Sequence, residues 1–250
     1  MRALIGIVFL LLAGSVGAQE RLSGTNVDVR LGIALKAPEA AVLKLIPDGW
    51  EMNSPTTGPG QGMNLSLTLL EQVSSQDAQG NAIDPIRGVA VGIPVRRKGT
   101  DVTGNMVVAG LFTPKGVPGA YGVYVPANVE VERKQRSDGD GKTLIEERWI
   151  FKGVDGDTLE AQIQYARGAT TRAKTESKVF SGARPDFYRI YRVDAVSDVA
   201  RSAATGVDRV SAIALKVSGK KLAALFDGTE KIVSITSIPS YSRQVFLTGP

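Results

Sequence analysis

The sequence predicts a β-rich α+β protein, with one domain built on a largely antiparallel, barrel-like sheet and a few short helices. Between Tyr121 and Ala166, stretches of alternating apolar and polar residues are separated by Asp-Gly turns. This pattern is typical of a meander of β-hairpins. No long linker, repeat or low-complexity tract divides the remaining chain, so a single domain over residues 19–250 is expected.

Residues 1–18, MRALIGIVFLLLAGSVGA, have the pattern of a secretory signal peptide. Arg2 precedes an apolar run from Ala3 to Ala13, and small residues lead to Ala18. The run is shorter than the ~20 residues that span a bilayer, and no later segment is apolar enough to do so. We expect cleavage near Ala18, and a mature protein of roughly 230 residues in the periplasm or outside the cell.

The chain ahead of the meander is expected to form strands around one short helix. Pro38 suits the first turn of a helix over residues 38–45, and Pro47 disfavours its continuation. Residues 54–62 and 76–85 are expected to be loops. Apolar residues alternate or cluster in four expected strands, of which the last is the most apolar and therefore central: 26–34, 64–73, 87–96 and 105–112.

The meander itself is expected to contain strands over residues 123–135, 143–151 and 158–165. Residues 169–182 are polar and charged, and we expect a loop there. Val193, Val196, Val199 and Ala203 recur at helical spacing, which predicts a helix over 194–204. A short helix is expected over 220–226, and the remaining expected strands are 187–193, 212–217, 232–237 and 244–247.

Composition excludes several kinds of chemistry. The chain contains no cysteine and no histidine, so a catalytic thiol, a histidine base and the common zinc sites are ruled out. We expect no metal and no cofactor. The formal net charge of +5 is too small to argue for a nucleic-acid partner, although arginines and aromatics are interleaved in RPDFYRIYR, residues 184–192. We interpret that stretch as a strand at the edge of the core.

Glu147 is a candidate for a buried carboxylate. It alternates in phase with Trp149 and Phe151, whereas its neighbour Glu146 points to the opposite face of the same strand. A buried carboxylate can act as a general acid or base. The alternative is an inward ion pair with an arginine or lysine, and we prefer it.

The order of elements resembles the acetoacetate decarboxylase-like superfamily. The similarity is carried by AAVLKLIPDGW, by the strand RGVAVGIPVR, and by the block PKGVPGAYGVYVPANVEV from residue 114. The resemblance implies a β-rich α+β barrel around an apolar pocket. It also implies a lysine that forms a Schiff base with a keto substrate, and such an amine must lose its proton by desolvation or beside another cation.

Two alignments with the family's Gly-Arg-Glu…Gly-Phe-Pro-Lys-Lys block remain open. In one, Pro126 matches the proline, Tyr121 replaces the glutamate, and Ala127 and Asn128 replace the two lysines. In the other, Pro114-Lys115 matches Pro-Lys, but a glycine follows in place of the second lysine. The strand pattern favours the first alignment, in which Lys115 is a turn residue.

Two functions follow. The first is a binding module that holds a small hydrophobic, keto or aromatic molecule in an apolar pocket. The second is a lyase that acts on a keto acid, with Lys115 as amine or with Glu147 as acid and Arg148 or Arg96 holding a carboxylate. The sequence leaves a homo-oligomer open. The residues expected to line the ligand site are Tyr121, Tyr124, Arg148, Trp149, Phe151 and Tyr165.

Overall fold

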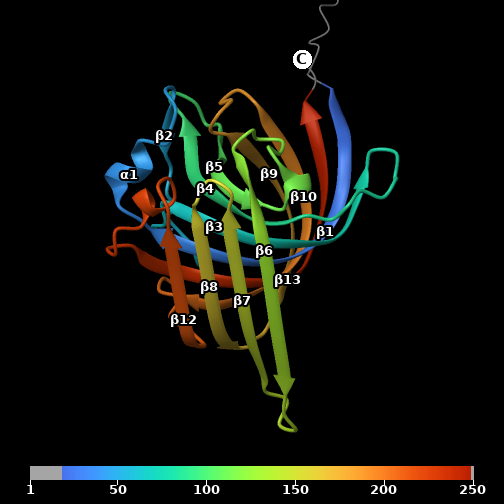
Figure 1. Ribbon diagram of the computed structural model, residues 1–250, viewed down its shortest axis with the longest axis vertical. Coiled ribbons are helices and arrows are strands. Elements are labelled where there is room, and N and C mark those ends of the chain that lie inside the picture. Colours follow the sequence, from blue (N-terminus) through green and yellow to red (C-terminus); the bar gives the residue numbers. More distant parts are fainter. Residues whose placement is uncertain (1–18, 249–250) are drawn as a thin grey trace, which may run out of the picture.

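The strands of this chain form one 13-stranded, mostly antiparallel sheet (Figure 1). The structure is a computed structural model that describes residues 19–248, and the expected signal peptide over residues 1–18 lies outside them. The strands are β1 (Glu20–Lys36), β2 (Trp50–Met52), β3 (Leu65–Asp77), β4 (Arg87–Arg97), β5 (Thr103–Phe112), β6 (Tyr124–Ser137), β7 (Thr143–Gly153), β8 (Thr158–Ala166), β9 (Thr171–Ser181), β10 (Tyr188–Ser202), β11 (Val207–Asp208), β12 (Val210–Ser218) and β13 (Lys231–Thr248). The helical segments are α1 (Glu39–Leu43) and two 3₁₀ turns, η1 (Pro114–Gly116) and η2 (Ala223–Leu225).

Seven of the strands close into a ring. They follow one another in the order β5, β9, β10, β13, β1, β3 and β4, and β4 pairs again with β5. On its other edge β5 pairs in parallel with β9 and, near its end, with β6. From β6 the meander continues through β7 and β8 to β12, and these four strands cross the long ring strands β1 and β13 at a steep angle (Figure 1).

The main core fills the space between the ring and the meander. Alternate residues of the ring strands, such as Leu31, Leu67 and Val91, are fully buried there. They pack against inward residues of the meander, among which Trp149 and Phe151 are also fully buried. Burying each such side chain stabilises the fold by about 1.5–3 kcal/mol. The remaining alternate residues of the ring strands face the opposite way, toward the inside of the ring.

The predicted fold class is confirmed. The structure is a β-rich single domain with very few short helices, and the strands predicted before residue 166 are all present. The meander has its Asp-Gly turns at the predicted positions. Strand β5 is central, as predicted, because it pairs with three strands, β4, β6 and β9. The short strand β2, which has three residues, was not predicted.

The helix predicted over residues 194–204 is wrong, because β10 continues without interruption to Ser202. Its pairing with β13 has register shifts between Val196 and Asp198 and between Val199 and Arg201. Each such irregularity inserts a residue and interrupts the strict alternation of a strand. The resulting spacing of apolar residues imitates a helix.

The loop predicted over residues 169–182 is also wrong, because Thr171–Ser181 forms β9. The first eight residues of this strand are exposed, and only the last three are buried. A strand without a buried face needs no apolar alternation, so periodicity gave no signal. The strands predicted over residues 232–237 and 244–247 form one continuous strand, β13. Pro239 lies within it, at an irregularity in its pairing with β1. The short helix over 220–226 is reduced to η2.

Candidate functional site

A cavity of about 410 Å³ lies within the ring. All seven ring strands contribute to its wall, and strands such as β3, β10 and β13 do so through alternate residues, as a strand does when it presents one face to an interior. On β3, for example, Thr68, Leu70 and Gln72 line it, whereas Leu67 and Leu69 belong to the main core on the other side. The cavity is therefore separated from the core beneath the meander by the ring strands themselves.

Three arginines line this cavity, from β1, β10 and β13: Arg30, Arg189 and Arg243. The wall is thus cationic and polar as well as apolar, unlike the apolar pocket that the family resemblance implies. A guanidinium group presents a fork of donors that matches a carboxylate, and it keeps its charge when buried. The three side chains differ in how many of these donors the protein already uses.

Arg30 is engaged within the protein. Its Nε donates to Oδ2 of the fully buried Asp28 at 2.9 Å, and its Nη2 also contacts that carboxylate. Its guanidinium lies over the ring of Tyr241, 3.4 Å from the centroid. Arg30 and Asp28 therefore form a neutral pair in the wall, and the pair is held by a cation–π contact.

Arg243 and Arg189 add positive charge that is less completely matched. Arg243 donates from Nε to Oδ1 of Asn26 at 2.7 Å and lies over the ring of Tyr191, 4.4 Å from its centroid. Burial alone would lower the pKa of Arg243, but Tyr191 and Asp28 raise it above its ordinary value, so it stays charged. The Nε of Arg189 is buried and has no hydrogen-bond partner among residues 19–248.

Tyrosine hydroxyls complete the polar part of the wall. The hydroxyls of Tyr121 and Tyr191 hydrogen-bond to each other, and Ser181 Oγ donates to the backbone oxygen of Tyr121 at 2.6 Å. Burial raises the pKa of Tyr121 well above its ordinary value, and the neighbouring Tyr191 and Tyr124 raise it further. Burial likewise raises the pKa of Tyr124. Both hydroxyls therefore remain protonated donors at neutral pH.

The ring of Tyr124 is held on three sides. It stacks on Phe112 with centroids 4.0 Å apart and the planes inclined by 23°. Two glycines lie against it, since a Cβ atom at Gly110 or Gly119 would come within 2.7 Å or 2.3 Å of a ring carbon. Side chains at either position would displace the ring, so both glycines allow Tyr124 to face the cavity.

Two connecting segments border the cavity outside the strands. The segment between β3 and β4 contributes Ile83 and Ile86, and the one between β5 and β6 contributes Gly116 and Ala120. Lys115 and Asp84, one from each segment, form an ion pair. Lys115 is not part of the cavity wall, and no lysine of the described chain lines it.

The two alignments of the family block can now be placed in the fold. Ala127, which takes the position of a lysine in the first, is buried in the main core beneath the meander, and Asn128 beside it is exposed. Lys115, which the second alignment would make the amine, has 69% of its side chain exposed. Neither alignment puts an amine inside the ring.

Glu147 is buried under the meander and does not line the cavity. Its carboxylate accepts hydrogen bonds from Trp149 Nε1 at 2.9 Å and from the Tyr165 hydroxyl at 3.0 Å. The Nε of Arg133 lies 3.4 Å from it, so the inward ion pair considered for this residue is present. Burial raises the pKa of Tyr165, and the charge of Glu147 raises it further, which keeps that hydroxyl a donor.

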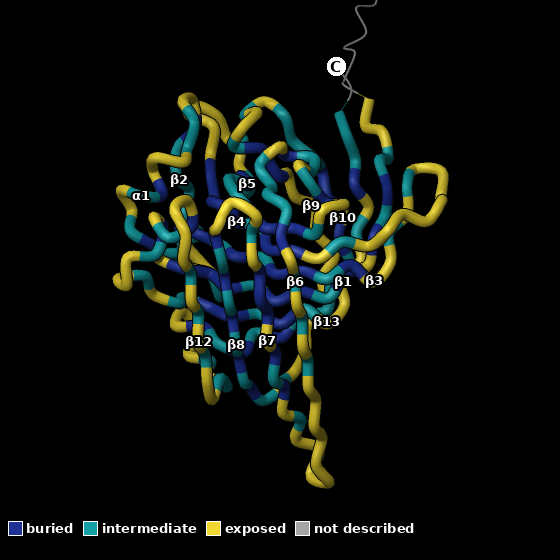
Figure 2. The backbone as a smooth tube through the Cα atoms, in the orientation of Figure 1, coloured by how far each residue is buried: buried dark blue, intermediate teal, exposed yellow. Residues whose placement is uncertain are grey.

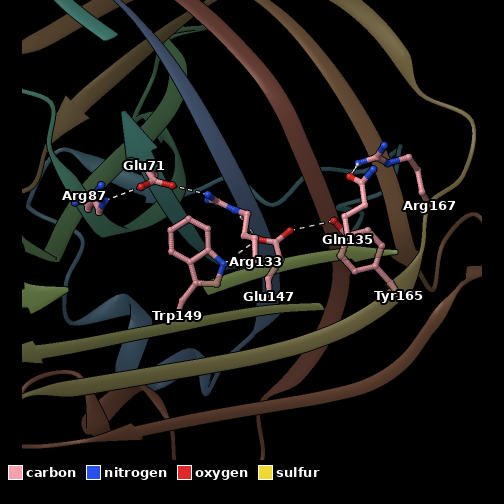
Figure 3. A network of polar contacts seen from close by, with 8 residues as sticks. All are labelled: Glu71, Arg87, Arg133, Gln135, Glu147, Trp149, Tyr165 and Arg167. Carbon is pink, nitrogen blue, oxygen red and sulfur yellow. Dashed lines mark hydrogen bonds and ion pairs between the residues drawn. The ribbon is translucent and has the colours of Figure 1, made fainter. Parts of the chain in front are cut away.

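The contacts of Glu147 continue into the ring (Figure 3). Arg133 also contacts Glu71 on β3, which in turn accepts from Arg87 Nε on β4 at 2.6 Å. Hydrogen bonds from these two arginines lower the pKa of Glu71, although burial acts in the opposite direction. The polar chain therefore links the meander to the ring, which is a structural role.

The residues predicted to line one site are divided between two regions. Tyr121 and Tyr124 line the cavity, whereas Trp149, Phe151 and Tyr165 lie in the main core, and Arg148 faces solvent in an ion pair with Glu160. Arg96 is likewise exposed and paired with Glu51. The inward face of the meander packs against the ring rather than around a ligand, which is why alternation alone could not locate the site.

Among the cavity residues that were not predicted are all of its arginines and two of its tyrosines: Arg30, Arg189, Tyr191, Tyr241 and Arg243. For two of them the sequence carried a signal. Arg189 and Tyr191 belong to RPDFYRIYR, where arginine and tyrosine occupy alternate positions and so share one face of β10. A buried face with arginines and tyrosines is unusual for a structural strand and typical of an anion-binding wall.

Within residues 19–248, no group of three acidic side chains is placed to hold a metal ion. None of the helices in that part of the chain has the length and hydropathy needed to cross a membrane.

Comparisons with known proteins give matches in structure alone. No protein-family model matches the sequence, and no curated protein is detectably similar to it. The enduracididine biosynthesis enzyme MppR, complexed with the condensation product of pyruvate and imidazole 4-carboxaldehyde, matches with a TM-score of 0.52 and 10% identity, over 98% of this chain and 96% of that one.

Two further solved structures agree with this result. MppR complexed with pyruvate also matches with a TM-score of 0.52 and 10% identity, over 98% and 97% of the two chains. An acetoacetate decarboxylase-like enzyme from Sphingomonas wittichii RW1 matches with a TM-score of 0.52 and 11% identity, over 96% of each chain. The resemblance inferred from the order of elements is thus confirmed in three dimensions: over nearly its whole length, this chain has the fold of the acetoacetate decarboxylase-like enzymes.

Proposed function

We propose that this protein binds a small carboxylic acid with a keto or aromatic group in the cavity inside the ring, without forming a covalent bond to it. The observation that carries the proposal is the position of Arg189, Arg243 and Arg30 in one wall, where no lysine of the described chain is present. Arginines can bind a carboxylate, but they cannot act as the neutral amine that Schiff-base chemistry needs.

The donors in the wall suit such a ligand. The unpartnered Nε of Arg189 is a buried donor, and a buried donor without a partner costs about 1–3 kcal/mol until an acceptor reaches it. Protonated hydroxyls of Tyr121 and Tyr124 can donate to a keto oxygen, and the ring of Tyr124 with Val107 offers apolar surface. The structurally similar MppR has been solved with pyruvate, a small keto acid.

The test is calorimetric titration with pyruvate and phenylpyruvate, and with the matching amides, which lack the carboxylate charge. We expect the acids to bind and the amides to bind at least about tenfold more weakly, since a charge-assisted hydrogen bond contributes about 1.5–3 kcal/mol. Arg189→Gln should weaken the acids similarly. Arg148→Gln, which changes an exposed arginine on the meander, serves as the matched control.

Equal binding of acids and amides, or no effect of Arg189→Gln, would contradict the proposal. The lyase hypothesis makes a different prediction, because it requires borohydride to trap a keto acid on Lys115 or requires turnover that Glu147→Gln abolishes.

We also propose that residues 1–18 direct export. The mass of the mature protein recovered from cells would test this, with an N-terminus at Gln19 as the expected result.

A further inference from the structure

Most of the length of β6 has a free edge. On one side the strand pairs with β7 from Ala127 to Ser137, and on the other it pairs with β5 only over Tyr124–Pro126. From Ala127 onward that second edge has no strand partner in the part of the chain that the structure describes. A long free edge presents unpaired N–H and C=O groups and can pair with another strand.

The backbone groups directed to the free edge belong to the odd-numbered residues. The oxygen of Pro126 accepts from Val154 N at 2.9 Å, and the N–H of Asp138 donates to Lys142 O at 3.0 Å, so even-numbered residues bond toward β7. Successive residues of a strand direct their backbone groups to opposite sides. The donors and acceptors on the free edge are therefore those of Val129, Val131, Arg133 and Gln135.

The even-numbered side chains on this stretch are all exposed, and their charges change sign at Arg133, with two acidic residues before it and two basic residues after it: Glu130, Glu132, Lys134 and Arg136. We propose that this edge pairs with the same edge of a second copy, antiparallel and centred on Arg133, to form a two-fold symmetric dimer. Glu132 then lies opposite Lys134 of the other copy, and Glu130 lies opposite Arg136. An isologous interface of this kind is closed and requires no further copies.

The hydrogen bonds and the charges select the same register. When the pairing is centred on Arg133, odd-numbered residues lie opposite odd-numbered residues. Their backbone groups point to the free edge in both copies, as the hydrogen bonds of an antiparallel ladder require. The charged residues then fall at positions without mutual hydrogen bonds, where opposed Cα atoms are only about 4.5 Å apart and cross-strand pairs interact most. Shifting the centre to Glu132 or Lys134 would bring two glutamates or two lysines face to face.

Arg133 itself, at the proposed axis, does not repel its copy strongly. Its side chain turns to the inner face of the strand, where it contacts the carboxylates of Glu71 and Glu147 (Figure 3). The charge is thus matched within each protomer. The neighbouring Val129 and Val131 are packed partly against the main core and leave no large exposed apolar surface on the edge.

The shape of the molecule allows a second copy to approach. The hairpin that joins β6 to β7 extends beyond the rest of the protein, and it is exposed along its length (Figure 2). Edge strands are often protected from pairing by like charges such as lysines. Here the charges on the edge sum to zero and have opposite signs in the two halves of the strand, which favours pairing with an inverted copy.

Sedimentation velocity over a concentration series tests the proposal with charge reversals. Glu132→Lys and Lys134→Glu each create two like-charge contacts per dimer, because the symmetry repeats every contact. We expect each to weaken dimerisation at least about tenfold. The double variant E132K/K134E exchanges the two charges and should restore the dimer. A monomer at every concentration, or single reversals without effect, would overturn the proposal.

Cysteine cross-linking tests the register, and it is specific because the chain has no cysteine of its own. Oxidising a mixture of the Glu132→Cys and Lys134→Cys proteins should give a covalent dimer in high yield, since opposed Cβ atoms in this register lie within disulfide distance. A mixture of Asn128→Cys and Lys134→Cys, which the register separates by four residues, should give little. Equal yields from both mixtures, or no covalent dimer from either, would overturn the proposal.

Discussion

The ammonium group of Lys115 forms an ion pair with the carboxylate of Asp84, and the two side chains keep 69% and 65% of their surface exposed. An exposed ammonium group is solvated by water, whereas a Schiff-base amine must be desolvated or lie beside another cation. The pair connects the two segments that border the cavity. Lys115 therefore occupies a position suited to linking loops, outside the cavity wall.

Lys115→Met is expected to leave keto-acid binding unchanged within about twofold, because an exposed ion pair contributes little. Calorimetry with phenylpyruvate measures this, and mass spectrometry after borohydride treatment shows whether any lysine carries the ligand. Labelled Lys115 in the unaltered protein, lost in the variant, would revive the lyase hypothesis.

Glu147→Gln is expected to destabilise the protein by about 2–4 kcal/mol. The change leaves the Arg133 charge without its inner partner, and breaking a largely buried pair costs about 3–5 kcal/mol when no water reaches it. The side chain of Arg133 is 26% exposed, which reduces the cost. Urea unfolding followed by tryptophan fluorescence measures the change.

Glu146→Gln is the matched control for this prediction. Glu146 is the neighbouring residue on β7, points to the opposite face and is not fully buried. Its replacement should change the free energy of unfolding by less than about 0.5 kcal/mol. Equal effects of the two variants would mean that the buried network does not stabilise the junction between ring and meander.

Acid should destabilise the folded protein in part through Glu71. Its pKa is lowered from the ordinary value of 4.5 because hydrogen bonds from Arg87 and Arg133 outweigh burial. A lowered pKa contributes stability above the unfolded-state value, and this contribution is lost as pH falls through the folded-state value. Glu71→Gln should therefore be less stable than the unaltered protein at pH 7, and the difference should shrink below pH 4.5.

Alkaline pH should destabilise the folded protein in part through the cavity tyrosines Tyr121 and Tyr124. Burial raises the pKa of Tyr121 and Tyr124 above the ordinary value of 10.0, so their contribution to stability is present below pH 10 and is lost as pH rises through the folded-state values. In a titration above pH 10, the folded protein should show less tyrosinate absorbance in the ultraviolet than the unfolded chain does at the same pH. A folded protein whose tyrosines all ionise at pH 10 would contradict the buried placement of these two.

Gly119→Ala should destabilise the protein more than Gly122→Ala, by about 1–3 kcal/mol. Both glycines have a φ of +70°, so alanine meets the same backbone strain at each position. Only at Gly119 does the added Cβ collide with the ring of Tyr124. The difference between the two variants in thermal unfolding and in ligand affinity therefore measures the effect of displacing the Tyr124 ring.

The fold could be predicted from the sequence wherever a strand has one buried and one exposed face. The meander strands β7 and β8 meet that condition, and their alternation and turns were sufficient. The alternation failed for β9, whose first eight residues are exposed, and for β10, whose pairing with β13 is irregular. These two strands pair with each other and with β5 and β13, and the partners distant in the chain leave no local pattern in their sequences.

The site was harder to predict for a related reason. Tyr121 and Tyr124 were among the predicted ligand-site residues, and both line the cavity. The arginines are spread over β1, β10 and β13, and only the pairing of these strands, which lie far apart in the chain, brings them together. Ring closure also decides which face of each strand is inside, and the two buried faces of a ring strand look alike in sequence.

Strand β13 carries three of the cavity residues and lies between β10 and β1, so the sheet has a gap at its centre until this last strand is in place. Residue Glu20 on β1 is paired with Thr248 on β13, which means that the earliest and latest parts of the described chain meet. A nascent polypeptide that still lacks residues 231–248 can form the meander hairpins but cannot shut the barrel. The protein should consequently acquire its ligand-binding chamber only after synthesis of this segment is finished, and a truncation before Lys231 should remain open and prone to degradation.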